Sequence, residues 1–255
     1  MTTKIQAALQ DIARHQQINT LLACETGSRA WGFPSPDSDY DVRILYVHQT
    51  EWYLSVQEEK NTLDYMLENK ELDISGWELR KSLILLRKSN AALLERIQSP
   101  IQYLADDDFV ADMLLAAKSC YSKIATMHHY HSMAFKLWEE LQAAPTYKLK
   151  KFFYALRAAT LCKWILEQDA IPPIEFKKAY LQLLPQDLIQ RIETLIELKS
   201  QKSESYFHAG EPELFDFIKT SIELAGVKKD GLSAGNANPD ELNHLLRKYV
   251  RKYDH

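Results

Sequence analysis

The sequence has little glycine and little cysteine: seven and three residues among 255. The cysteines, Cys24, Cys120 and Cys162, lie far apart and form no CxxC pair. That spacing argues against a disulfide framework and against a cysteine-based metal site. No apolar run approaches the roughly 18 residues that a membrane-spanning helix requires, and the N-terminal residues lack the apolar core of a signal peptide. We therefore expect a cytoplasmic protein with reduced thiols that does not enter the membrane.

Charge is close to balanced, with a formal net charge of −4 at pH 7. Residues 1–110 carry 11 Lys and Arg against 17 Asp and Glu, so carboxylates are concentrated in the first half. This balance is too weak to predict a nucleic-acid surface from charge alone.

The two halves of the chain show different hydrophobic patterns. The first half mixes apolar runs typical of strands with helical spacing, whereas the second half shows helical spacing almost throughout. The pattern predicts an α+β fold: a mixed-sheet domain over 1–105, followed by an all-α bundle over 106–255. Expected strands cover 18–28, 41–49, 61–67 and 71–79, with a polar turn at 68–71. Expected helices cover 4–17, 76–90, 91–99, 106–142, 146–168, 172–184, 185–205, 211–229 and 239–253.

The stretch "GSRAWGFPSPDSDYDVR" orders several chemical groups around the start of a predicted strand. Side chains alternate along a strand, so Asp39, Asp41 and Arg43 are predicted to share one face. Two neighbouring carboxylates repel each other unless a cation lies between them. Mg²⁺ suits this position because it prefers oxygen ligands and leaves room for substrate phosphates.

The residues before this pair suit phosphate binding. Gly27 can adopt positive φ and let a backbone N–H approach a phosphate closely. Ser28 adds a hydroxyl donor and Arg29 a positive charge. Either motif alone is common in ordinary loops, and the ordered combination is what predicts a metal–phosphate site. Arg43 has two interpretations, a salt bridge that orients Asp41 or a contact with phosphate.

These residues resemble the signature of the polymerase-β-like nucleotidyltransferase superfamily. The form "PSPDSDYDVR" is most similar to its bacterial DNA-polymerase-β-like family, which is associated with RNA-repair pathways. The segments "ELDISGWELRKSLILLRKSN" and "KLKKFFYALRAATLCKWI" extend the resemblance over most of residues 20–180. The resemblance implies a nucleotidyltransferase domain followed by a helical domain, with the nucleotide held in a cleft between them.

The family pattern also implies a third carboxylate on a neighbouring strand. Two candidates exist, Asp64 and Asp73, and Asp73 is preferred because its strand leads into the "GWELRK" helix. Three convergent carboxylates could hold two Mg²⁺ ions, or Mn²⁺ in their place, about 3.5–4 Å apart. The resemblance thus assigns catalysis and metal binding to Asp39, Asp41 and Asp73.

Within the second half, Lys150, Tyr154 and Arg157 occur at i, i+4 and i+7 and so share one helix face. The resemblance implies that such cationic and aromatic residues grip the triphosphate and stack on the base. The alternative is a solvated polar face.

Two further clusters carry weaker signals. His128, His129 and His131 could contact substrate or form plain helix surface, and they lack the partners of a zinc site. The closing "RKYVRKY" could contact an RNA backbone or dock on the protein through one face, and docking is the preferred interpretation.

The combined expectation is a Mg²⁺-dependent nucleotidyltransferase that transfers a nucleoside monophosphate from an NTP to a hydroxyl. The family association favours an RNA end, such as that of a tRNA, as acceptor. Two alternatives stay open: transfer to a protein hydroxyl, as in antitoxin-like relatives, and a non-catalytic nucleotide-binding module.

Overall fold

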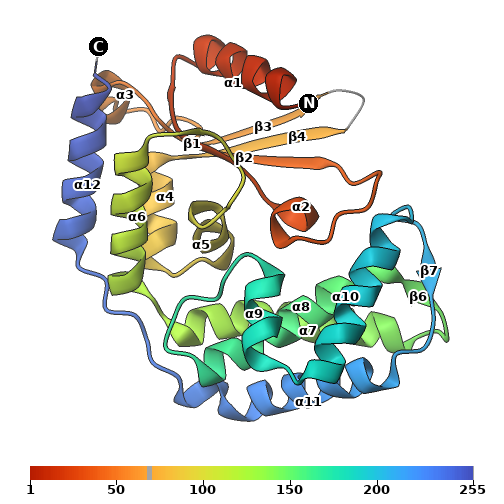
Figure 1. Cartoon of the computed structure of the whole chain (residues 1–255). Helices are drawn as coiled ribbons and strands as arrows, with labels where there is room; N and C mark the ends of the chain where they lie inside the picture. Colours follow the sequence, from red (N-terminus) through yellow and green to blue (C-terminus); the bar gives the residue numbers. More distant parts are fainter. Residues whose placement is uncertain (68–70, 255) are drawn as a thin grey trace. The chain divides into compact units, whose positions relative to one another are not determined.

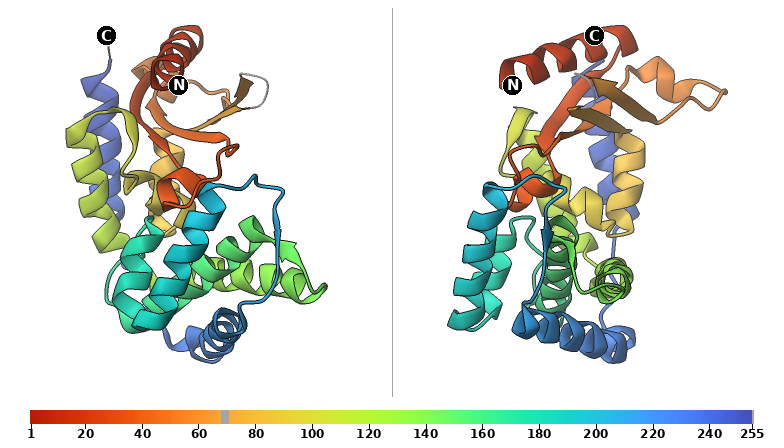
Figure 2. Two further views of the ribbon diagram at one scale, coloured as in Figure 1. Left: turned by 45° about the vertical axis from the view of Figure 1, so that its right-hand side comes forward. Right: turned by 90° about the vertical axis from the view of Figure 1, so that its right-hand side faces the viewer.

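The computed structural model describes residues 1–67 and 71–254, and the chain divides into two compact units. The first unit contains residues 1–27, 39–121 and 235–255, and the second contains residues 28–38 and 122–234. Both units are therefore discontinuous in sequence, as the colours of Figures 1 and 2 show.

A five-stranded sheet with the order β3-β4-β2-β1-β5 forms the centre of the first unit. β2 and β4 run parallel and all other neighbours run antiparallel, so the sheet is mixed. β-branched and aromatic residues dominate β2, which explains its strand preference. The strands are β1 (Asn19–Glu25), β2 (Tyr40–Val47), β3 (Thr62–Leu67), β4 (Leu72–Glu78) and β5 (Gln102–Ala105).

Helices cover both faces of this sheet (Figure 1). On one face, α1 (Thr2–Gln16) buries Ile5 and Leu9 in a core that includes Val42 and Ile44 of β2. Because side chains alternate along β2, Asp41 and Arg43 lie on the opposite face. The remaining helices of this unit are α3 (Thr50–Leu54), α4 (Leu79–Arg87), α5 (Ala91–Ile97), α6 (Asp107–Cys120) and α12 (Pro239–Lys252).

The second unit is mainly helical, with α8 at its centre. α8 packs against α7, α9 and α11 and is buried over most of its circumference. No helix of the described residues is long and apolar enough to cross a membrane. The elements are α2 (Gly27–Trp31), α7 (Lys123–Gln142), β6 (Tyr147–Lys148), α8 (Leu149–Glu167), α9 (Phe176–Leu183), α10 (Gln186–Ser200), β7 (Phe207–His208), α11 (Pro212–Lys228) and the 3-10 helix η2 (Lys229–Gly231).

The α+β class predicted from the sequence is confirmed, and some elements differ. The single helix expected over 106–142 is wrong, because α6 ends at Cys120 and α7 begins at Lys123. Ser122 separates them by accepting a hydrogen bond from the Ala125 N–H, which is an N-cap. β5 was not expected. Most of the predicted turn at 68–71 lies outside the described residues.

The compact units differ from the division expected at residue 105. α6 lies beyond that point and yet packs against β1 and α4 of the first unit. α12 closes the chain by packing against α4 and α6. Conversely, residues 28–38 of the expected catalytic domain belong to the helical unit, where Phe33 stacks on Phe153 with ring centroids 5.0 Å apart.

Candidate active site

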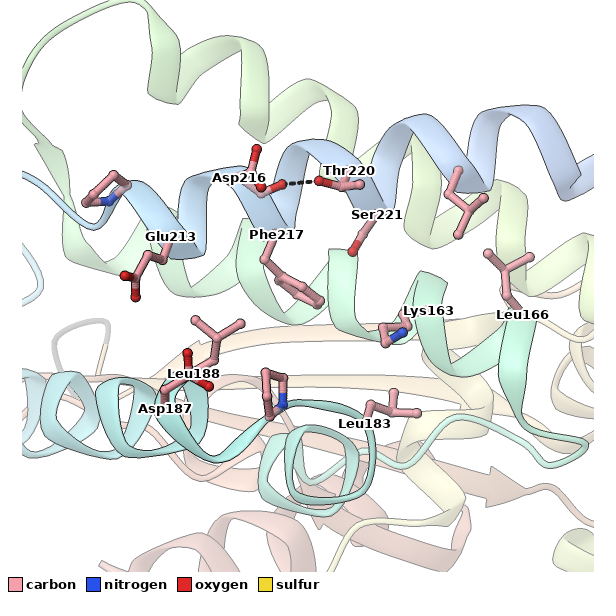
Figure 3. Close-up of a pocket in the computed structure, with 13 residues that line it drawn as sticks. Lys163, Leu166, Leu183, Asp187, Leu188, Glu213, Asp216, Phe217, Thr220 and Ser221 are labelled. Atoms are coloured by element: carbon pink, nitrogen blue, oxygen red, sulfur yellow. Dashed lines mark hydrogen bonds between the residues drawn. The ribbon is translucent and has the colours of Figure 1, made fainter.

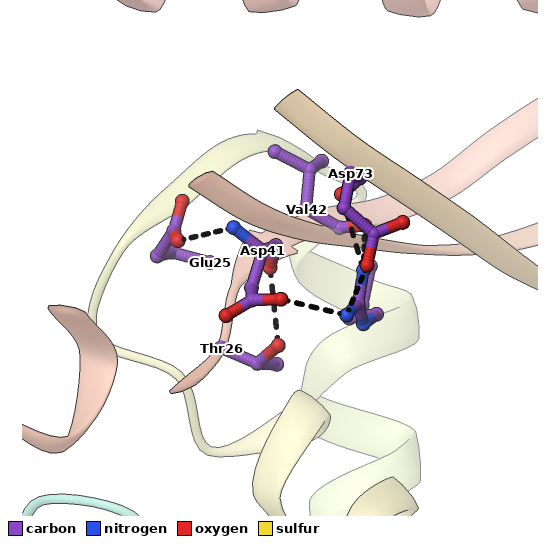
Figure 4. A network of polar contacts seen from close by, with 6 residues as sticks. Glu25, Thr26, Asp41, Val42 and Asp73 are labelled. Carbon is purple, nitrogen blue, oxygen red and sulfur yellow. Dashed lines mark hydrogen bonds and ion pairs between the residues drawn. The ribbon is translucent and has the colours of Figure 1, made fainter. Parts of the chain in front are cut away.

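Asp41 and Asp73 lie directly opposite each other on the parallel strands β2 and β4. One guanidinium nitrogen, Arg43 Nη2, is 2.8 Å from Asp41 Oδ1 and 2.8 Å from Asp73 Oδ2 (Figure 4). The other, Arg43 Nη1, donates to the backbone carbonyls of Val42 and Asp73, at 3.1 Å each. Arg43 therefore holds the two carboxylates together and offsets their repulsion.

The Gly27 turn lies against Asp41. The Thr26 N–H and hydroxyl donate to the Asp41 carbonyl at 2.9 and 3.0 Å. Gly27 has φ +62°, and a Cβ built on it would lie 2.2 Å from Asp41 Oδ2. Glycine is therefore required here both by conformation and by space. The two halves of the sequence motif, Gly27 and Asp41, are in direct contact.

Glu25 is a carboxylate that the sequence reasoning missed. It is fully buried at the end of β1, and it accepts hydrogen bonds from the Asp41 N–H, at 2.8 Å, and from the Tyr103 hydroxyl. Glu25 thus fixes the backbone N–H of Asp41, while Thr26 fixes its carbonyl (Figure 4). A glutamate inside the apolar run "TLLACE" was the available signal, since a buried charge needs partners.

The other two acidic candidates are placed differently. Asp39 is exposed and precedes β2. Asp64 of β3 lies opposite Ser75 of β4. Its side chain is 70% exposed, and its Oδ2 is 3.9 Å from Lys60 Nζ. The structure therefore brings Asp73, and not Asp64, next to Asp41. No group of three or more His, Cys, Asp or Glu side chains suited to a metal occurs among residues 1–67 and 71–254.

A second arginine, Arg96 of α5, adds buried positive charge on the same face of the sheet. Its guanidinium lies 3.3 Å from the centroid of the Trp77 ring, which is a cation–π contact. Burial, and then the like charge of Arg43, lower the pKa of Arg96 to about 9. Its buried Nη1 has no hydrogen-bond partner among the described residues.

Ser28 and Arg29 both form hydrogen bonds with Ser38, at the other end of the loop that separates Gly27 from Asp39. Arg29 Nη2 donates to the Ser38 carbonyl at 2.6 Å, and the buried Ser28 hydroxyl donates to Ser38 Oγ at 3.2 Å. Both residues thus have a role within the protein, in shaping the loop over residues 28–38.

Two residues from the end of α10 and the segment after it anchor this loop within the helical unit. Glu204 Oε1 accepts from the Ser38 hydroxyl at 2.8 Å. Lys199 Nζ donates to Ser35 Oγ at 2.9 Å, and Lys199 is only 2% exposed. Burial lowers the pKa of Lys199 to about 8, against the opposing effect of Glu204.

The three residues predicted to share a cationic face of α8 differ in burial: Lys150 and Tyr154 line a cavity, whereas Arg157 is buried. Lys150 Nζ is 2.6 Å from Glu204 Oε2, and Lys150 and Tyr154 line a cavity of about 730 Å³ together with three more lysines, Lys136, Lys148 and Lys151. Arg157 is buried, donates to the Ile174 carbonyl and lies 4.4 Å from the Trp31 ring centroid. The expectation that Arg157 grips a nucleotide does not fit this position, because almost every face of α8 is packed.

A second cavity of the helical unit, of about 780 Å³, lies between α8, α10 and α11. Figure 3 shows Phe217 and Leu188 facing its interior, and Asp187, Glu213 and Asp216 around it. Three carboxylates and one lysine, Lys163, thus line this cavity, whereas three carboxylates and four lysines line the first. The three α7 histidines of the sequence prediction line neither cavity.

Comparison with models of known protein families identifies the family. The sequence profile of the RNA repair pathway DNA polymerase beta family matches residues 1–248. A Bacillus subtilis protein described as uncharacterized protein YcgL is 36% identical over 261 residues, which cover 99% of this chain and 97% of that protein. A crystal structure of a nucleotidyltransferase-like protein from Exiguobacterium sibiricum is 13% identical, with a TM-score of 0.32, over 98% of this chain and 81% of that one.

Proposed function

We propose, since the chain belongs to the RNA repair pathway DNA polymerase beta family, that it transfers a nucleoside monophosphate from an NTP to a hydroxyl group, with Mg²⁺ as cofactor. The observation that carries the proposal is the pairing of Asp41 with Asp73, with Gly27 packed against Asp41. The acceptor we favour is an RNA end, which the family description supports.

The donor set is chemically suited to Mg²⁺. Asp41 and Asp73 supply carboxylate oxygens, the ligands that this ion prefers, and each side chain is about one-third exposed. Asp39, two residues before Asp41, is the third acidic residue that we assign to this set. When bound, the ion would supply positive charge against the triphosphate and the leaving pyrophosphate.

The chain's own groups define the rest of the proposed reaction. The acceptor hydroxyl forms a bond to the α-phosphorus as the bond between that phosphorus and the bridging oxygen of pyrophosphate breaks. The Asp73 carboxylate is the proposed acceptor of the hydroxyl proton. Gly27 lets the turn pack directly against the Asp41 carboxylate, because a Cβ at this position would lie 2.2 Å from Asp41 Oδ2. Arg43 would orient both carboxylates through its anchored Nη1.

One observation favours a second candidate, a non-catalytic nucleotide-binding module. Arg43 already places a cation between the two carboxylates, and a resident guanidinium could replace the metal. This alternative predicts nucleotide binding without turnover.

Incubation with α-labelled NTPs and Mg²⁺, alone and with total RNA or purified tRNA, tests the proposal. Label on RNA supports the proposal. Label on protein alone would indicate that the acceptor is a protein hydroxyl. The Asp41→Asn variant should lose transfer, and Asp64→Asn, a matched exposed change on β3, should keep it. Nucleotide binding with no transfer to any acceptor would favour the non-catalytic module.

A further inference from the structure

The first unit carries a shallow groove between α4 and α12, helices from distant parts of the sequence that lie side by side (Figures 1 and 2). The groove has a volume of about 160 Å³, and both apolar and polar side chains line it. Its lining residues are Arg80, Leu83, Ile84, Arg87, Pro239, Leu242, Asn243 and Leu246.

Arginines line the α4 side of the groove, and others lie near it on α12. On α4, Arg80 and Arg87 are seven residues apart and so lie on one exposed face, separated by about 10 Å at 1.5 Å per residue. On α12, Arg247 follows Asn243 by four residues, which places it next to this groove residue, and Arg251 lies one further turn along the helix. None of the four arginines forms an ion pair with any described part of the chain, although Arg80 lies 5.0 Å from the Tyr53 ring centroid.

These arginines are not needed to dock α12. Docking is achieved by the neighbouring lysines, because Lys248 Nζ is 2.5 Å from Asp112 Oδ2 and Lys252 Nζ is 2.7 Å from Asp106 Oδ2, both on or next to α6. Tyr249 and Tyr253 donate to the same two carboxylates. The helix thus presents one basic stripe to the protein and leaves a second exposed. The exposed basic stripe ends at the first turn of α12, where the acidic residues Asp240 and Glu241 lie.

We propose that the groove between α4 and α12 binds the phosphate backbone of the RNA acceptor. This inference rests on the proposed transfer to RNA and specifies the surface that holds the RNA. Guanidinium groups match phosphate geometry with paired hydrogen bonds. An open groove with charges about 10 Å apart suits an extended strand better than an enclosed small ligand. Since its edges offer phosphate contacts and few base-reading groups, binding should be largely independent of RNA sequence.

The test measures fluorescence anisotropy of a 5′-labelled, 20-nucleotide single-stranded RNA of mixed sequence, without NTP or Mg²⁺, at 50 and 200 mM KCl. The Arg87→Glu/Arg247→Glu variant should bind about tenfold more weakly than the unaltered protein. The slope of log affinity against log salt should fall by about 1.4, since each phosphate contact in a single strand contributes about 0.7. Circular dichroism and thermal unfolding establish that the variant is folded, and Arg87→Gln/Arg247→Gln should give a smaller loss.

A matched control makes the same change of net charge at two exposed positions of α11, in Lys219→Glu/Lys228→Glu. This control should bind RNA within twofold of the unaltered protein. Equal losses in both double variants would overturn the inference, because they would show a response to net charge alone. Competition by poly-glutamate as strong as by RNA would overturn it as well, in favour of an acidic protein partner.

Failure of the proposed function gives a different pattern. If Asp41→Asn binds RNA normally and the Arg87→Glu/Arg247→Glu variant does not, the groove inference stands whether or not transfer occurs. If transfer to RNA occurs and both double variants bind RNA equally well, the groove inference fails and the proposed reaction stands.

Discussion

Asp41 and Asp73 face each other across the only parallel strand pair of the described sheet, and a single nitrogen of Arg43 is 2.8 Å from both. This relationship gives the arginine two roles that can be separated experimentally. It stabilises the folded protein by offsetting repulsion between the acids, and under the proposed function it would compete for the position of the divalent ion.

Replacement of Arg43 by methionine should therefore lower stability and strengthen metal binding. We expect a loss of about 1–3 kcal/mol, since a partly buried carboxylate pair is left without its cation. Thermal unfolding with and without Mg²⁺ measures both effects. The ion should raise the Tm of Arg43→Met more than that of the unaltered protein. Equal Mg²⁺ responses in the two proteins would contradict a metal site at Asp41 and Asp73.

Replacement of either paired acid should abolish transfer while leaving the fold intact. Asp41→Asn and Asp73→Asn each remove a charge next to the reacting phosphates, and we expect a loss of about a hundredfold or more in kcat. Asp64→Asn serves as the control, because this exposed residue lies away from Arg43. Transfer kinetics with a labelled NTP give the comparison. Activity lost in Asp64→Asn and kept in Asp73→Asn would reverse the assignment.

The contact of Gly27 with Asp41 predicts a position-specific effect of alanine. Gly27→Ala must accommodate both a positive φ and a Cβ directed at the Asp41 carboxylate, whereas Gly32→Ala meets positive φ, +97°, with no atom within 4 Å of its Cβ. Strain from φ alone costs on the order of 1 kcal/mol. Both variants should lose stability in chemical denaturation, and only Gly27→Ala should also lose activity. Matching activities in the two variants would show that the Asp41 contact has no catalytic consequence.

Burial of Lys199 predicts a distinctive pH dependence. Its pKa in the folded protein, about 8, lies below the unfolded value of 10.5, so the unfolded chain binds more protons between these values. The contribution of Lys199 to the unfolding free energy should therefore rise with pH across that window, by at most about 1.4 kcal/mol per pH unit. The measurement is the difference in unfolding free energy between the unaltered protein and Lys199→Met at pH 7.5, 8.5 and 9.5. A difference independent of pH would show that Lys199 keeps its ordinary pKa.

Lys150 and Arg157 both lie on α8, yet their substitution should affect different properties: nucleotide binding for Lys150 and stability for Arg157. Arg157→Met removes a buried guanidinium over Trp31 and should cost about 2–3 kcal/mol of stability. Its KM for NTP should stay the same under conditions where the protein is folded. Lys150→Met should have little effect on stability and raise that KM. The reverse pattern would restore Arg157 as a nucleotide contact.

Local spacing was sufficient to predict the central part of the site. Period-two alternation predicted one face for Asp39, Asp41 and Arg43, and the structure joins Asp41 to Arg43 while Asp39 precedes β2. The packing of Gly27 against Asp41 was not predicted, because the sequence analysis assigned this glycine to a phosphate contact. Helical spacing put Lys150 and Arg157 on one side of α8 but could not reveal that packing buries Arg157, because burial depends on residues distant in sequence. Glu25 escaped notice for the same reason, since its partners Tyr103 and Asp41 come from two other strands.

Nothing in the sequence indicated that residues 28–38 leave the first unit, because their packing partners lie far away along the chain. The loop over 28–38 joins the helical unit through Phe33, Ser35 and Ser38, none of which carries a local signal for such packing. The break between α6 and α7 did have a local signal, Ser122 as an N-cap, but the apolar pattern continues on both sides of it.

The chain returns to its first unit only with residues 235–255, and this order has a consequence for synthesis. On the ribosome, β1–β5 emerge early, yet the surface of α4 and α6 that α12 covers stays bare until residues 239–252 have left the exit tunnel. Nascent chains expose such surface to aggregation and to chaperones. Removal of α12 should therefore lower the yield of the folded sheet, although α12 begins more than two hundred residues after the end of β1.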